Sequence, residues 1–330
     1  MRRIKLAAAI LTLGMIIAAP EWGAAAEARA LFPAKKQGKY GFIDRTGNLV
    51  IPPRFENAGA FFSGRALVQL AGKWGYIDTA GKVVIDPRFD SANPFYDGLA
   101  LVESGKRQYF INPDGKVVID VGGQEAGFFG DGRAWINRSG KIGFIDRTGK
   151  IVIPPGFNSV VGGFYQGLAA VKQEGKWGFI DLQGAMVIPP QFEAAGCFAE
   201  GLAAFQLQGK YGFIDKNGGA VIKPQFDFAD RFSEGLAPVK LGDKFGYVDR
   251  TGRIAISPQF LAAYPFSEGL AWVDLGDRMG AIDRSGKVVL RATPGLPGQF
   301  QGGLAHFQDT WSGYLDRSGK VIWQDSDSIE

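Results

Sequence analysis

Residues 176–192 read K-W-G-F-I-D-L-Q-G-A-M-V-I-P-P-Q-F, and this stretch recurs with small changes along most of the chain. Its central glycine, Gly178, has counterparts at steps of 33 to 35 residues from Gly41 to Gly313, if Tyr109 is taken as the landmark of a degenerate copy that lacks the glycine. The chain therefore contains nine copies of one unit. A period of this length is typical of solenoids, propellers and related arrays, in which each unit buries its apolar face against its neighbour.

Each copy contains three short segments rich in β-branched and aromatic residues, separated by glycines and turn residues. This composition favours antiparallel strands, so the mature chain is predicted to be all-β with almost no helix. A turn of the form D-x-x-G, such as Asp181 to Gly184, follows the second segment. Asp at the first position accepts hydrogen bonds from nearby backbone N–H groups, and Gly at the fourth adopts a left-handed conformation. We therefore interpret the repeated aspartates as turn residues rather than metal ligands.

The connector between copies carries a Phe three residues before the glycine of a G-L-A motif. We expect these rings to fill equivalent volumes between neighbouring units and so to form a ladder through the core. We also expect Gly178 and its counterparts to be small because a ring or a neighbouring backbone approaches them. The eight rings are Phe61, Phe95, Phe129, Phe164, Phe198, Phe232, Phe266 and Phe300.

The first segment of each copy presents two faces, because side chains alternate across a strand. The face that contains Ala66 and Val68 is apolar in every copy and is predicted to be buried. The second position of the other face varies most freely and includes Trp and His, and an Arg stands at its first position in two copies. Trp and Arg are enriched at binding hot spots, so this face is predicted to contact a partner. The candidate contact residues are Arg65, Arg133, Trp135, Trp272 and His306.

The first 26 residues differ from the rest of the chain. Arg2, Arg3 and Lys5 precede an apolar run, and small residues follow it up to Ala26. This pattern predicts a secretory signal peptide over residues 1–26 and a β domain over residues 27–330. The nine repeats occupy about residues 31–323 and are followed by a short polar tail. The mature chain is thus predicted to be exported, periplasmic or extracellular, with no membrane span after cleavage.

Charge and residue usage exclude several classes of function. Removing residues 1–26 takes three basic residues and one acidic residue from the 37 and 33 of the whole chain, which leaves a net charge of +2. Such a balance argues against a nucleic-acid partner. The single histidine, His306, excludes multi-histidine metal sites and histidine-based triads. We predict no catalytic, cofactor-binding or metal-binding residues and no cofactor.

The motif K-W-G-x-I-D-x-x-G, seen around Trp74 and Trp177, resembles the bacterial WG-repeat (KWG-repeat) family. The resemblance covers about residues 31–323, although Tyr40, Tyr211 and Phe245 replace the tryptophan and the third copy loses the glycine. The connectors after Ile119 and Leu290 also depart from the pattern, and we expect irregular packing there. Members of this family are repeat-bearing bacterial proteins, often exported, so the resemblance implies an architecture rather than an activity.

The nine units can form an open array or a closed ring. Propellers usually have four to eight blades, and no strand is left over at either end to complete a shared closing blade. These two arguments favour an open β-solenoid or superhelical array of three-stranded repeats, with a closed β-propeller as the alternative.

The predicted function is that of an exported, non-enzymatic scaffold that binds a protein or an envelope polysaccharide. A glycan-processing enzyme built on the repeats and a calcium-stabilised structural array are the alternatives, because acidic residues are numerous. The sequence makes no prediction of oligomeric state.

Overall fold

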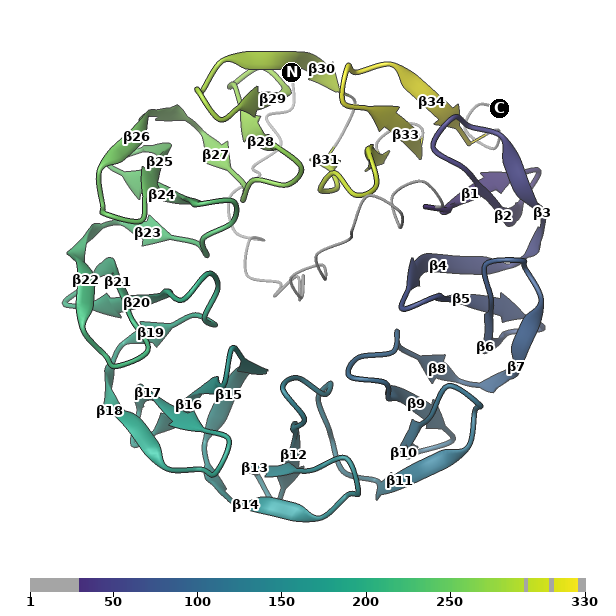
Figure 1. The fold of residues 1–330 in the computed structure, drawn as a ribbon, viewed down its shortest axis with the longest axis horizontal. Coiled ribbons are helices and arrows are strands. Elements are labelled where there is room, and N and C mark those ends of the chain that lie inside the picture. The colour runs from purple at the N-terminus through teal and green to yellow at the C-terminus, as the bar shows by residue number, and fades with distance from the viewer. Residues whose placement is uncertain (1–29, 294–295, 309–311, 326–330) are drawn as a thin grey trace, which may run out of the picture.

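The computed structural model describes residues 30–293, 296–308 and 312–325, and it shows nine small antiparallel sheets arranged in a ring (Figure 1). We call these sheets blades 1 to 9, in chain order. Within the described residues the chain forms strands and turns and contains no helix, as the composition predicts, and none of these residues belongs to a helix suited to crossing a membrane. The predicted signal peptide lies outside the described residues.

Seven blades have four strands and two have three. The strands of blades 1 to 5 are β1 (Phe32–Lys36), β2 (Lys39–Ile43) and β3 (Leu49–Phe55); β4 (Asn57–Phe62), β5 (Arg65–Leu70), β6 (Lys73–Ile77) and β7 (Val83–Phe89); β8 (Ser91–Ala92), β9 (Ala100–Ser104), β10 (Arg107–Ile111) and β11 (Val117–Gly122); β12 (Ala134–Arg138), β13 (Lys141–Ile145) and β14 (Ile151–Phe157); β15 (Ser159–Tyr165), β16 (Leu168–Gln173), β17 (Lys176–Asp181) and β18 (Met186–Phe192). Those of blades 6 to 9 are β19 (Ala194–Ala195), β20 (Ala203–Leu207), β21 (Lys210–Ile214) and β22 (Ala220–Phe226); β23 (Phe228–Ala229), β24 (Leu236–Leu241), β25 (Lys244–Asp249) and β26 (Ile254–Phe260); β27 (Ala262–Ala263), β28 (Leu270–Asp274), β29 (Met279–Asp283) and β30 (Val288–Thr293); β31 (Leu296–Pro297), β32 (Leu304–Gln308), β33 (Ser312–Asp316) and β34 (Val321–Gln324).

Each blade contains the three predicted strands, and the connector adds a short fourth strand in most of them. The last strand of each blade lies on the outer rim of the ring (Figure 1). Blade 4 has only three strands because its connector, which follows Ile119, is reduced to single backbone pairings such as Ala126 with Ile136. This is one of the two connectors expected to be irregular. The other includes residues 294–295, which lie outside the described residues.

The glycine of the W-G motif is small because the third strand of its own blade bulges toward it. In blade 5, Trp177 pairs with Phe192 and Phe179 pairs with Ile188, so the third strand has two more residues between these pairs than the second strand. The bulge brings the Ile188 carbonyl oxygen within 2.5 Å of the position that a Cβ on Gly178 would occupy. The expectation of a close backbone approach is confirmed.

The predicted Phe ladder is also confirmed. All eight connector rings are buried. Phe198, for example, packs edge-on against Phe179 of the preceding blade, with ring centroids 5.0 Å apart. Equivalent aromatic pairs link seven successive junctions, from Phe42–Phe61 between blades 1 and 2 to Tyr247–Phe266 between blades 7 and 8.

The last two junctions replace a missing ring with one from a different strand. Blade 8 has Ala281 where other blades have the second-strand aromatic, and Trp272 on β28 stacks on Phe300 instead, at 5.3 Å and 12°. Blade 1 lacks a described connector, and Phe32 on β1 contacts Tyr314 of blade 9 at 5.4 Å. Both substitutions keep an aromatic pair in the core of the junction.

The prediction of an open solenoid or superhelical array is wrong, because the nine blades close into a nine-bladed propeller (Figure 1). The contact between blades 9 and 1, which we call the seam, shares its glycine packing with the other junctions. At each of the nine junctions the Gly of a D-x-x-G turn, or of the equivalent Asn112 to Gly115 turn in blade 3, packs against an Ile or Leu of the preceding blade. At the seam Gly47 packs against Ile322. The missing shared strand does not prevent closure, since apolar side chains from both ends form one cluster: Phe32, Ala34, Ile43, Leu304 and Tyr314, with Ala30, Ile322 and Trp323.

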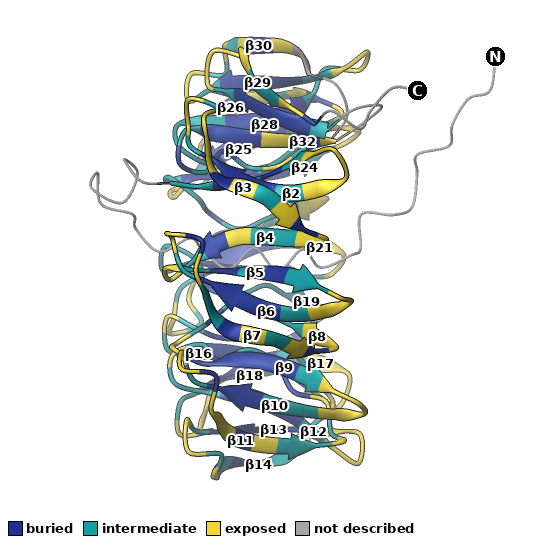
Figure 2. Cartoon of the chain, turned by 90° about the vertical axis from the view of Figure 1, so that its right-hand side faces the viewer, coloured by how far each residue is buried: buried dark blue, intermediate teal, exposed yellow. Residues whose placement is uncertain are grey.

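Viewed from the side, the ring has buried strands in its interior and exposed turns on both faces (Figure 2). In the D-x-x-G turn of blade 7, Asp249 accepts hydrogen bonds through Oδ1 from the N–H groups of Thr251 and Arg253. Gly252 has a φ of 87°. The turn chemistry predicted for the repeated aspartates is therefore observed.

Candidate functional site

Two kinds of turn meet on one face of the ring, which we call the turn face. One is the D-x-x-G turn. The other, which we call the acid–glycine turn, precedes the first long strand, as at Glu200-Gly201, where both residues have positive φ. Glu200 accepts a hydrogen bond of 3.0 Å from the N–H of Gly235 in the next blade. Six successive junctions share this bond: Asp97 to Gly132, Asp131 to Gly167, Gln166 to Gly201, Glu200 to Gly235, Glu234 to Gly269 and Glu268 to Gly303.

The series ends at the seam, because blade 9 has Gly302 where these six blades have Asp, Gln or Glu. Gly302 has a φ of 60°, and a Cβ on it would lie 2.8 Å from the Cβ of Ala30 and 3.1 Å from the ring of Phe32. The Phe32 side chain, which packs across the seam, therefore leaves no room for a side chain at position 302. As a result, the seam has no carboxylate to reach from blade 9 toward blade 1.

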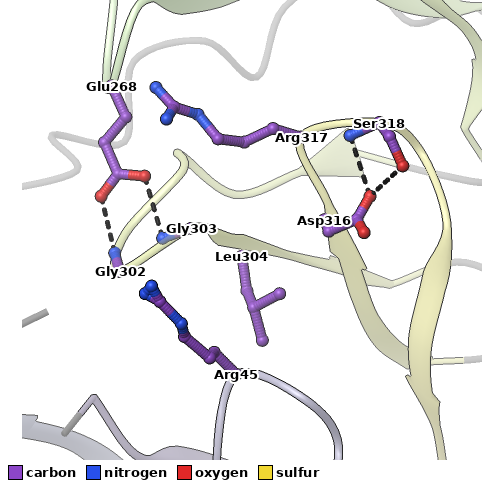
Figure 3. A pocket seen from close by; sticks show the side chains of 8 residues that line it. All are labelled: Arg45, Glu268, Gly302, Gly303, Leu304, Asp316, Arg317 and Ser318. Atoms are coloured by element: carbon purple, nitrogen blue, oxygen red, sulfur yellow. Dashed lines mark hydrogen bonds between the residues drawn. The ribbon is translucent and has the colours of Figure 1, made fainter. Parts of the chain in front are cut away.

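An arginine at the second position of the D-x-x-G turn usually meets the acid–glycine turn of the preceding blade. Arg250 donates a hydrogen bond of 2.7 Å to the backbone oxygen of Glu200, and the Arg284 guanidinium lies 3.9 Å from the Glu234 carboxylate. Arg45 has the same position in blade 1. Its side chain points toward Gly302, which offers no carboxylate (Figure 3).

A pocket of about 450 Å³ lies at this break in the repeat (Figure 3). We call it the seam pocket. Glu268 crosses it and accepts hydrogen bonds of 2.6 and 2.9 Å from the N–H groups of Gly302 and Gly303. The lining residues are Arg45, Glu268, Gly302, Gly303, Leu304, Asp316, Arg317 and Ser318.

The second carboxylate of the pocket, Asp316, belongs to a D-x-x-G turn. It accepts bonds of 2.8 and 2.6 Å from the N–H and hydroxyl of Ser318, and another of 3.0 Å from the N–H of Lys320. Burial raises the pKa of Asp316, but these hydrogen bonds outweigh burial and leave the pKa below its ordinary value. Asp316 is therefore an ionised turn residue near neutral pH.

The two arginines of the pocket differ from its carboxylates. Neither Arg45 nor Arg317 forms an ion pair or hydrogen bond with any residue that the structure describes, whereas Glu268 and Asp316 accept the bonds given above. A guanidinium presents several N–H donors in a plane that suits a carboxylate or a similar anion. The arrangement can hold an anionic group, and the described lining contains no histidine that would activate a nucleophile and no cysteine that would act as one.

The structure does not bring the five predicted contact residues together, because they lie in blades 2, 4, 8 and 9. Trp272 is only 3% exposed and donates its indole N–H to the Gly298 oxygen at 2.8 Å. Trp135 is half-buried and bonds the Gly162 oxygen of blade 5 at 3.1 Å. These two tryptophans fill junctions between blades, so little of either is available to a partner.

The other three predicted residues are also engaged within the ring. Arg65 bonds the Gly64 oxygen, and Arg133 bonds the oxygens of Gly132 and Leu182. His306 lies 3.0 Å from the Ser312 hydroxyl and packs edge-on against Tyr314. The face that was expected to meet a partner packs between blades in a closed ring, which explains why its residues are mostly buried or half-buried.

Sequence reasoning missed Arg45, Arg317 and Glu268. A signal for them exists, because Gly302 departs from the Asp, Gln or Glu of the six preceding copies. The calcium alternative requires a cluster of ligands. Within residues 30–293, 296–308 and 312–325, no group of three or more His, Cys, Asp or Glu side chains forms a metal-binding cluster. The turn aspartates use Oδ1 to accept backbone N–H groups.

Comparison with solved structures shows a similar fold at low identity. A eukaryotic initiation factor is 12% identical, with a TM-score of 0.66, over 90% of this chain and 95% of that one. AztD from Citrobacter koseri is 16% identical, with a TM-score of 0.46, over 91% of this chain and 95% of that one. BamB from Moraxella catarrhalis is also 16% identical, with a TM-score of 0.45, over 83% of this chain and 89% of that one. At 12% identity, the likeness to the initiation factor concerns the fold alone.

The repeats themselves identify the family. No curated protein matches the chain in sequence. The model of the WG containing repeat matches seven times, over residues 40–74, 74–107, 110–141, 142–177, 177–211, 211–245 and 245–278. These matches cover most of the ring, from the second strand of blade 1 to blade 8. The resemblance noted in the W-G motifs is thereby confirmed, and the chain belongs to the WG-repeat family.

Proposed function

We propose that this chain is an exported, non-enzymatic scaffold that binds a protein or a cell-envelope polysaccharide. Export is supported by the basic start, apolar run and small residues of positions 1–26. A binding role is supported by the closed ring, because buried aromatic pairs at its junctions hold the turn face in a fixed arrangement. Preorganised surfaces of this kind bind without a large cost in ordering.

The observation that carries the proposal is the seam pocket. It occurs where the repeat breaks, and a scaffold made of similar units can recognise a partner specifically only where the units differ. The pocket combines a volume suited to a bound group with two arginines that have no described partner. Its remaining polar groups belong to turns that hold the blades together, which favours binding over chemistry.

Site-specific photo-crosslinking in intact cells tests this proposal. A photoreactive amino acid replaces Ser318, which lines the pocket, and a matched variant carries it at Thr148, the same turn position in blade 4. We expect one reproducible adduct from position 318, in the extracytoplasmic fraction, and none from position 148. Equal adducts from both positions, or an uncleaved cytoplasmic chain, would refute the proposal.

A further inference from the structure

In the seam pocket the carboxylates have hydrogen-bond partners and the guanidiniums have none among the described residues. Both oxygens of Glu268 accept backbone N–H groups, and Asp316 accepts three bonds from its own turn. These carboxylates are thus already compensated by donors. The guanidiniums of Arg45 and Arg317 have no such partner among the described residues. The pocket therefore has a surplus of cationic donors for an incoming anion, although its formal charges balance.

The lining is almost entirely polar. Leu304 is the one apolar side chain of the described lining, and no aromatic ring contributes to it. Such a pocket has little to offer the hydrophobic side chains that anchor most protein partners. It does offer hydroxyl and carboxylate acceptors beside the two guanidiniums, and this mixture suits a molecule with many hydroxyl groups and one carboxylate.

At six junctions, including the one that Glu268 makes beside the seam pocket, a carboxylate or amide oxygen already bonds the next blade. At those positions the side chain extends across the turn face, as Glu200 does toward Gly235, and an arginine such as Arg250 bonds the same turn. Gly302 removes this side chain at the seam. Within the ring as described, a ligand carboxylate would take the place that the acidic residue takes elsewhere.

We infer that the seam pocket binds the carboxylate of an acidic sugar, such as a uronic acid unit within an oligosaccharide. In this arrangement Arg45 and Arg317 hold the carboxylate, and Ser318 and the pocket carboxylates bond sugar hydroxyls. This inference rests on the proposed scaffold function and narrows its partner to an anionic polysaccharide.

Calorimetric titration of the full mature chain with trigalacturonate tests the inference. Maltotriose, which is neutral, and trigalacturonate methyl ester, which lacks the charge, serve as matched ligands. We expect binding of trigalacturonate alone, weakened by added salt because the contact is ionic. Tighter binding of a hexaglutamate peptide than of trigalacturonate would overturn the sugar assignment in favour of a protein partner.

The variants Arg45→Gln and Arg317→Gln localise the binding. Each is expected to weaken trigalacturonate binding by at least about tenfold, because a charge-assisted hydrogen bond is lost. Arg147→Gln is the matched control, since Arg147 has the same turn position in blade 4 and lies against the Asp97-Gly98 turn. Thermal unfolding of each variant shows whether it remains folded, as expected for exposed side chains.

The outcomes separate this inference from the proposed function. Unchanged affinity in both pocket variants, or no binding of trigalacturonate by the wild-type chain, refutes the acidic-sugar site. An adduct from position 318 in intact cells would still support the scaffold in that case. Conversely, tight trigalacturonate binding that the pocket variants abolish confirms the site even if the chain proves to be cytoplasmic.

Discussion

The backbone N–H of Lys35 donates a hydrogen bond of 2.9 Å to Oδ1 of Asp325, a residue 290 positions further along the chain. The same oxygen accepts the indole N–H of Trp323 at 3.0 Å. Asp325 is 8% exposed. One nearly buried carboxylate thus joins the first strand of blade 1 to the end of blade 9, in the absence of a shared strand.

We predict that Asp325→Ala weakens ring closure. The change leaves the Lys35 and Trp323 donors without this acceptor, and an unsatisfied buried donor costs about 1–3 kcal/mol. Chemical denaturation is expected to show a loss of stability in this range. Asp243→Ala, in an exposed turn of blade 7, is the control and should leave the midpoint unchanged. Equal effects of the two changes would argue against a closing role for Asp325.

Gly178→Ala is predicted to be severely destabilising, at about 3 kcal/mol, since its new methyl group would lie 2.5 Å from the Ile188 oxygen and must displace backbone. Gly196→Ala adds the same group where the nearest atom is 3.8 Å away, and it should be nearly neutral. Thermal unfolding of the two variants under one set of conditions compares their losses of stability. A small effect at position 178 would mean that the bulged strand can shift.

Because Trp272 replaces the missing second-strand aromatic of blade 8, a phenylalanine at position 281 should restore stability that is lost when Trp272 is removed. Trp272→Ala removes the ring that stacks on Phe300 and should cost about 3–5 kcal/mol. Adding Ala281→Phe gives blade 8 the combination of blade 6, where Ala204 accompanies Phe213. The double variant should therefore regain part of the lost stability, measured by denaturant unfolding. If Ala281→Phe lowers stability further, the two rings do not occupy equivalent space.

The single histidine, His306, is predicted to make the stability of the fold depend on pH. Burial lowers the pKa of His306 from its ordinary 6.5, and the weaker effect of Asp325 opposes this shift. The unfolded chain therefore binds the proton first as the pH falls below about 6.5, so stability should decline in that range. The midpoint of urea unfolding between about pH 7.5 and 5.5 measures this decline. His306→Gln should flatten the profile there, because Asp316 and the other turn carboxylates with lowered pKa values titrate at more acidic pH. An identical slope in this variant would contradict the prediction.

Local chemistry explains which features of the fold are predictable. The Asp249 to Gly252 turn, the packing of Phe198 and the small size of Gly178 depend on residues within one repeat or its neighbour, so they recur visibly in the sequence. Ring closure depends instead on pairs such as Lys35 with Asp325, which occur once. A repeat pattern contains no information about such pairs. The prediction of an open array came instead from the number of repeats and the lack of a left-over strand.

The candidate site also combines a feature that is visible in the sequence with one that appears only in the closed ring. Gly302 can be recognised in the sequence as a departure from the Asp, Gln or Glu of the six preceding copies. Its consequence for Arg45 appears only when the two ends of the chain meet, because Arg45 belongs to blade 1 and Gly302 to blade 9. The variable face was misjudged for a related reason: Trp135 and Trp272 look available on a single repeat but lie between two blades in the ring.

Each blade is made of consecutive residues, since no strand is exchanged between the two ends of the chain. Blades can consequently assemble one after another as the polypeptide emerges during synthesis, each using partners that are near in sequence. The seam is different, because it needs the final blade, and joining ends so far apart carries the greatest entropic cost in the molecule. Closure of the ring is thus expected to be the last step of folding, and the seam pocket forms only when the ring is closed.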